Sequence, residues 1–168
     1  MSRTDTCLKN KLLLTLLLLL IVIIGLYFAT QFRGVQADAT PTDGKDLHNQ
    51  LLAEPSSVRG SWLRTLNPLV QDVQGGLVWN SPQQQGVMRF IRLPNPKKGT
   101  YYQLWLYDSR SQTDTPVSGA TFRQGSGKGE WFVPIHVTTP VLEPYKFELT
   151  LQSDQSGVPA QLLLMMQP

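Results

Sequence analysis

The chain has 168 residues, of which 41% are hydrophobic and 16% are charged, with a formal net charge of +3. This length is typical of a single globular domain. The charged fraction is below the roughly 25% of ordinary soluble domains, which indicates that the chain contains an apolar stretch of membrane type. From Thr30 onward, 12 Lys and Arg residues are balanced by 11 Asp and Glu residues, which excludes the basic stripe of a nucleic-acid-binding domain. Cys7 is the single cysteine, so an intramolecular disulfide is excluded as well.

The first predicted element is an apolar run at residues 12–29, which carries no charge and only one clearly polar residue, Thr15. At about 1.5 Å per residue, a helix of this length just crosses about 30 Å of hydrocarbon. Basic residues precede the run, and the positive-inside rule places them in the cytoplasm. The sequence therefore predicts a cytoplasmic tail at residues 1–11, a single transmembrane helix in the inner membrane and an extracytoplasmic remainder.

A cleaved signal peptide is the alternative interpretation of the same run. Val35-Gln36-Ala37 and Ala37-Asp38-Ala39 both resemble a small-residue cleavage site. Cleavage near Ala37 or Ala39 would release a secreted protein. The apolar run is longer than the ~7–15 residues of a signal core, and both sites lie well beyond its end, so the anchor is the preferred interpretation.

Residues 30–60 are predicted to form a linker, because Ala39–Gly44 has the Pro, Thr and Gly composition of a loop. A short helical turn is expected within it, since Leu47, Leu51 and Leu52 have helical spacing. A proline shortly after these leucines is expected to end the turn.

Short apolar or alternating runs follow from Ser61 onward, separated by Gly, Pro, Asn and Asp. Phe147, Leu149 and Leu151 alternate with polar residues, which is the two-residue period of a strand with one wet face. Strands so close in sequence favour antiparallel pairing. Residues 61–168 are therefore predicted to form an all-β, antiparallel β-sandwich of the immunoglobulin-like type. The predicted strands are Trp62–Leu66, Leu69–Val73, Leu77–Asn80, Val87–Leu93, Tyr101–Tyr107, Val117–Phe122, Trp131–Val137, Tyr145–Leu151 and Leu162–Met166.

The sequence offers no convincing catalytic or metal-binding pattern. His48 and His136 lie in different segments, and neither has a companion at metal-ligand spacing. The run Gly125–Gly129 lacks the full form of a phosphate loop and is predicted to be a flexible hairpin. We therefore expect no enzyme activity, no bound metal and no cofactor.

One segment resembles a known family. The pair Leu93-Pro94, a short basic loop ending at Gly99 and the run Tyr102–Leu106 resemble the core signature of the C-terminal domain of anti-sigma-K factors, the RskA family. From about residue 50, similar segments follow in the family's order: Leu51–Pro55, Gly76–Trp79, Gly119–Phe122, and Phe147–Leu151 with Gly157 and Pro159. The family-signature residues, which are also the candidate interaction residues, are Trp79, Leu93, Pro94, Gly99, Tyr102, Leu104, Trp105, Gly119, Phe122, Thr150, Gly157 and Pro159.

The resemblance implies an extracytoplasmic β-sandwich that one membrane helix joins to a cytoplasmic anti-sigma domain. The His and Cys zinc-binding motif of that cytoplasmic domain is missing here, and Gln152 replaces the usual acidic residue after the Thr-Leu strand. We therefore expect a regulatory or interaction module that acts through a protein partner in the envelope or membrane, without direct binding of a sigma factor. The alternative is a general cell-envelope domain that binds a ligand or scaffolds a complex, with no link to transcription.

The two-residue period places Tyr102 and Trp105 on opposite faces of their strand, with Leu104 and Leu106 on the side of Tyr102. One face is expected to enter the core. The other is expected either to pack against a second layer or to bind a peptide or an envelope ligand through exposed aromatic side chains.

Overall fold

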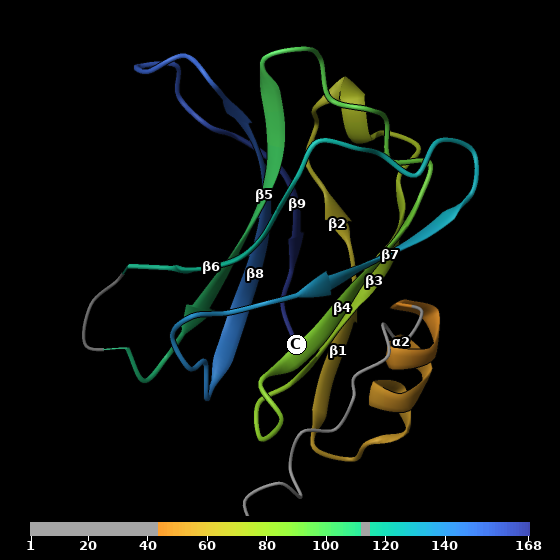
Figure 1. The fold of residues 1–168 in the computed structure, drawn as a ribbon, viewed down its shortest axis with the longest axis vertical. Coiled ribbons are helices and arrows are strands. Elements are labelled where there is room, and N and C mark those ends of the chain that lie inside the picture. Colours follow the sequence, from red (N-terminus) through yellow and green to blue (C-terminus); the bar gives the residue numbers. More distant parts are fainter. Residues whose placement is uncertain (1–43, 112–114) are drawn as a thin grey trace, which may run out of the picture. The chain divides into compact units, whose positions relative to one another are not determined.

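The computed structural model describes residues 44–111 and 115–168. They form two antiparallel sheets and one α-helix (Figure 1). The strand order is β1-β3-β4-β7 in the four-stranded sheet and β2-β9-β8-β5-β6 in the five-stranded sheet. The elements in chain order are α2 (Gly44–Ala53), β1 (Ser57–Ser61), β2 (Leu63–Arg64), the 3-10 helix η2 (Pro68–Val70), β3 (Gln74–Asn80), β4 (Gln85–Ile91), β5 (Thr100–Asp108), β6 (Val117–Phe122), β7 (Glu130–Ile135), β8 (Pro144–Ser153) and β9 (Gln161–Met166).

The prediction of an all-β fold with antiparallel pairing is confirmed for these residues. The tail and the transmembrane helix expected at residues 1–11 and 12–29 lie outside the described residues. Within the described ranges, no helix has the length and apolar character that crossing a membrane requires.

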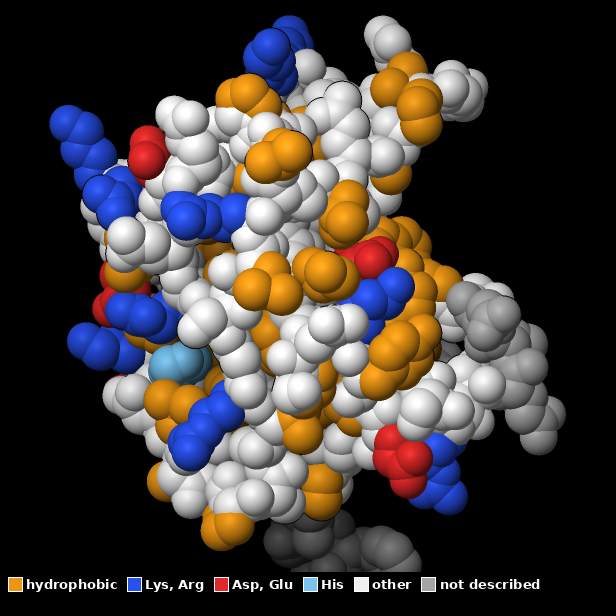
Figure 2. Space-filling model, turned by 180° about the vertical axis from the view of Figure 1, so that it is seen from behind, with side chains coloured by type: hydrophobic (Ala, Val, Ile, Leu, Met, Phe, Trp, Pro, Cys, Tyr) orange, Lys and Arg blue, Asp and Glu red, His pale blue; other side chains and the backbone are white. Residues whose placement is uncertain are grey.

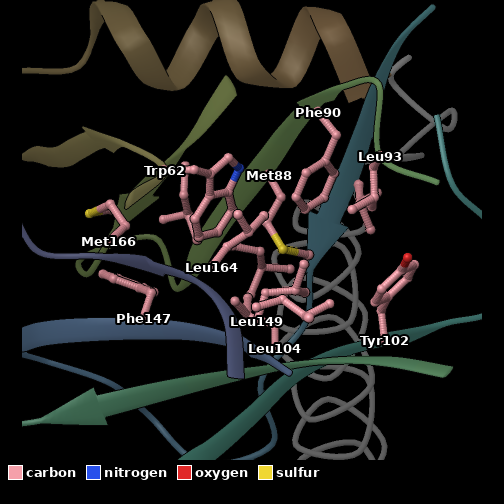
Figure 3. Close-up of a cluster of buried hydrophobic side chains, with 14 of the residues drawn as sticks. Trp62, Met88, Phe90, Leu93, Tyr102, Leu104, Phe147, Leu149, Leu164 and Met166 are labelled. Carbon is pink, nitrogen blue, oxygen red and sulfur yellow. The ribbon is translucent and has the colours of Figure 1, made fainter. Parts of the chain in front are cut away.

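The main apolar core lies between the two sheets. Phe147 and Leu149 of β8 are fully buried and face Met88 and Phe90 of β4 in the other sheet (Figure 3). Trp62 stacks on Phe90 with ring centroids 5.5 Å apart, and it lies between β1 and β2, where the chain passes from one sheet to the other. The alternation predicted for β8 is therefore an alternation between core and outer surface.

The helix α2 covers part of the outer side of the four-stranded sheet. Its Leu51 is buried in one cluster with Val78 of β3 and Val87 of β4, and Phe132 of β7 packs against this cluster. These apolar contacts make α2 part of the fold, so the helical turn predicted within the linker is confirmed.

The strand β1 lies across the expected end of the linker at residue 60. It pairs with β3 along its whole length, from Ser57 opposite Asn80 to Ser61 opposite Gly76. Within β1 only Val58 packs against the main core. Its short and mostly polar sequence therefore lacks the alternation by which a strand is recognised.

The prediction of a strand at Leu69–Val73 is wrong, because the first residues of this segment belong to the 3-10 helix η2. The side chain of Asn67 accepts a hydrogen bond from the Leu69 N–H at 3.0 Å, and Pro68 follows Asn67. An Asn cap followed by proline is a helix-start signal. Val70 and Val73 are buried, so the apolar run reflected burial and not a strand.

The hairpin predicted at Gly125–Gly129 is also wrong. This loop joins β6 to β7, which belong to different sheets. It is held against the β4–β5 loop, because the Ser126 N–H donates to the Leu93 carbonyl at 2.9 Å and the Gly125 N–H donates to Asn95 Oδ1 at 2.8 Å. The connection is therefore a fixed crossover between the sheets.

Replacing Gly125 by Ala should destabilise the fold by about 1–3 kcal/mol, because of overpacking. An added Cβ would lie 2.2 Å from the Pro94 carbonyl oxygen, which is backbone and cannot move aside cheaply. Gly129→Ala in the same loop is the matched control, since its nearest atom would be 3.8 Å away. The measurement is urea unfolding of the full-length protein in non-ionic detergent, followed by tryptophan fluorescence. Equal midpoints for the two variants would contradict the crossover packing.

Candidate interaction surface

Five of the twelve family-signature residues pack in the main core. Trp79, Leu93 and Leu104 are fully buried, Tyr102 is 1% exposed, and Phe122 packs against the same core. The Phe122 and Tyr102 ring centroids are 5.3 Å apart. Burial raises the pKa of the Tyr102 hydroxyl to about 12. These residues therefore act mainly through packing.

Four further signature residues shape loops and close contacts. The Pro94 carbonyl accepts the hydrogen bond of the Tyr102 hydroxyl at 2.8 Å. Gly99 and Gly157 have φ values of +83° and +82°, which glycine adopts without strain. An added Cβ on Gly119 would lie 2.3 Å from the Cδ1 atom of a core leucine. These four residues, like the five in the core, therefore have structural roles.

Trp105 and Thr150 are the signature residues on the other side of the five-stranded sheet, while Pro159 is exposed in the β8–β9 loop. We call this side of the sheet the outer face. A row of register partners crosses it from Trp105 through Glu148 and Met165 to Leu63. The outer face comprises Leu63, Tyr101, Gln103, Trp105, Tyr107, Lys146, Glu148, Thr150, Gln152, Leu162 and Met165. It therefore combines aromatic, aliphatic and polar side chains.

Hydrogen bonds hold Trp105 in place on the outer face. The Thr150 hydroxyl donates to the Gln103 carbonyl at 3.2 Å, and it accepts from Trp105 Nε1 at 3.2 Å and from Gln152 Nε2 at 2.9 Å. Thr150 and Gln103 are each only 7% exposed. All bonding positions of one buried hydroxyl are thus satisfied, which fixes the indole across two neighbouring strands.

A second cluster on the outer face consists of Tyr107, Lys146 and Glu148, in which the positive and the negative charge are paired with each other. The Tyr107 hydroxyl donates to Glu148 Oε2 at 2.6 Å, and Lys146 Nζ lies 3.0 Å from Glu148 Oε1. Lys146 Nζ also lies 3.8 Å from the centroid of the Tyr107 ring. Burial, and then the hydrogen bond to Glu148, raise the pKa of the Tyr107 hydroxyl above its ordinary value. The hydroxyl therefore remains a donor at neutral pH.

Aliphatic side chains on the outer face remain open to solvent. Leu63 is 54% exposed and Leu162 is 37% exposed, and both are linked through register to the strand of Trp105. Figure 2 shows hydrophobic side chains around a small group of acidic and basic ones on the face that it presents. Leu63 and Leu162 were missed as site residues because only strand register places them beside the signature.

Among residues 44–111 and 115–168, no group of three or more His, Cys, Asp or Glu side chains converges on a point. His48 lies in α2 and His136 follows β7.

Thr150→Val should destabilise the fold by about 1–2 kcal/mol, because the indole N–H of Trp105 and the amide of Gln152 lose their shared acceptor. Thr150→Ser, which keeps the hydroxyl, is the matched control and should lose clearly less. Urea unfolding of the full-length protein measures both. If the serine variant loses as much as the valine variant, the methyl group of Thr150 matters and its hydroxyl does not.

Comparison with known proteins gives one result. A family model described as anti-sigma-K factor rskA, C-terminal, matches residues 12–159. Neither a curated protein nor a solved structure matches the chain. The family match spans the apolar run and nearly all of the described strands, and it confirms the resemblance that the segment from Leu93 to Leu106 first indicated. The chain belongs to the family of anti-sigma-K factor RskA C-terminal domains.

Proposed function

We propose that this protein is a membrane-anchored regulatory module whose extracytoplasmic β-sandwich binds a protein partner, and that it does not bind a sigma factor directly. The observation that carries the proposal is the position of the outer face. The sheet whose inner side carries Tyr102 and Leu104 has exposed aliphatic and partly exposed aromatic side chains on its other side. Membership of an anti-sigma family supports the regulatory role.

The anchor in this proposal is the apolar run at residues 12–29, with residues 1–11 in the cytoplasm. Its support is the length of the run and the basic residues before it. The family match begins at residue 12, so the run is part of what the family shares. The domain is placed on the outer side of the inner membrane, where a partner in the envelope or membrane reaches it.

The outer face has the properties expected of a binding surface. Exposed aliphatic side chains next to a fixed tryptophan bury apolar area when a partner covers them. Trp105 is already held by Thr150, so little side-chain entropy is lost when it is covered. The Lys146–Glu148 pair leaves no net charge at this place, which favours a partner with an apolar patch. Catalysis forms no part of the proposal.

Leu63→Glu tests this proposal, because a charge in place of the exposed Leu63 side chain on the outer face should prevent a partner from covering it. We expect the variant, expressed at normal level in its own cells, to lose the protein that co-purifies with the full-length wild type after cross-linking. Transcripts of a sigma-factor regulon should change as they do in a deletion strain. Val158→Glu is the matched control, since Val158 is 47% exposed but lies in the β8–β9 loop and on none of the strands that form the outer face.

Two outcomes would count against the proposal. If the Leu63→Glu protein retains its partner, the outer face is not the binding surface. If only envelope-assembly proteins co-purify and no regulon responds to deletion, the protein is a general envelope scaffold without a link to transcription.

A further inference from the structure

The outer side of the four-stranded sheet contains a hollow of about 250 Å³ beside α2. We call it the basic groove. It is lined by His48 and Leu52 of α2, Arg59–Ser61 of β1, Gly75–Leu77 of β3 and Arg89 of β4. β1 is an edge strand, so the groove is accessible from the side of the sheet. In Figure 2, a histidine side chain lies among Lys and Arg side chains at one margin of the molecule.

The hollow exists because a glycine occupies the middle of a row of side chains. Ser61 is opposite Gly76, and Gly76 is opposite Arg89. A Cβ on Gly76 would lie 2.2 Å from the Gly60 carbonyl oxygen, so the close approach of β1 and β3 excludes any larger residue there. This row of register partners therefore has no side chain between the Ser61 hydroxyl and the Arg89 guanidinium.

Two guanidinium groups stand at this gap with donors to spare. Arg59 donates from one terminal nitrogen to the Leu52 carbonyl at 3.2 Å. Arg89 uses its Nε to bind Glu130 Oε1 at 2.5 Å. In the described part of the chain, the terminal nitrogens of Arg89 have no further partner. A guanidinium offers five N–H donors, so both side chains retain donors for an oxyanion.

The remaining walls of the groove indicate what kind of anion fits. Leu52 provides an apolar wall. His48 is held edge-on against Phe132 at 5.2 Å between ring centroids, and burial, as the largest effect, lowers its pKa. Its Nδ1 atom is buried and has no partner among the described residues. Because that atom does not open into the groove, we assign recognition of the anion to Arg59 and Arg89.

We propose that the basic groove binds a glutamate or aspartate side chain of an acidic segment on a partner protein. Arginine recognises carboxylates through paired N–H donors, and the neighbouring Glu130 already shows Arg89 bound to a carboxylate. Glu130 is thus an internal competitor for the same guanidinium. The apolar wall at Leu52 suits an aliphatic residue next to the acidic one. The groove lies on a different sheet from the outer face, so this inference does not rest on the proposed function.

The test uses the full-length protein in non-ionic detergent at low ionic strength. The probe is a fluorescein-labelled Glu-Leu-Glu-Leu-Glu peptide, and fluorescence anisotropy measures its binding. Arg59→Gln and Arg89→Gln should each weaken binding at least about tenfold. Arg64→Gln should leave it unchanged, because Arg64 likewise bonds a backbone carbonyl but lies outside the groove.

The variant Glu130→Gln is expected to bind the peptide more tightly, and a misfolded protein would not show such a gain in affinity. Removing the competing carboxylate should free Arg89 and tighten peptide binding several-fold. The neutral Gln-Leu-Gln-Leu-Gln peptide should not bind. The inference is overturned if the acidic peptide fails to bind, if the neutral peptide binds equally well, or if Glu130→Gln leaves the affinity unchanged.

Discussion

The structure depends on the division of β5 into two faces. Tyr102, Leu104 and Leu106 point into the core, while Trp105 points to the outer face. The Tyr102 hydroxyl binds the Pro94 carbonyl and so holds the loop by which the chain passes from β4 in one sheet to β5 in the other. Because β5 pairs with both β8 and β6, it aligns the core on one side and the outer face on the other.

The sequence predicted a strand correctly where a segment with alternating or continuous apolar residues also pairs with a neighbouring strand in a sheet. Phe147 and Leu149 are the clearest case, since their period of two is the period of burial in β8. Prediction failed where local chemistry or distant contacts decide the structure. Asn67 and Pro68 start η2 despite the apolar residues that follow. The hydrogen bonds from the Gly125–Gly129 loop to the β4–β5 loop span about thirty residues, and no local pattern reveals them.

The candidate surfaces were harder to predict than the fold. The family signature is mostly a packing signature, and only Trp105 and Thr150 reach the outer face. A register shift between Leu149 and Thr150 places Leu162 on that face and leaves Leu163 buried, and such a shift is not visible in a sequence. The basic groove likewise depends on Gly76 lying between Ser61 and Arg89, which belong to three different strands.

The central claim is that one N-terminal helix holds the β-domain on the outer side of the membrane, and cysteine labelling in intact cells tests it most directly. Cys7 is the single native cysteine, and Val158→Cys would add one in an exposed loop. A membrane-impermeant maleimide should label the added cysteine in intact spheroplasts and reach Cys7 only after lysis. Labelling of Cys7 before lysis, or protection of position 158 until lysis, would contradict this topology. A mature protein from which Cys7 has been removed would show a cleaved signal peptide in place of the anchor.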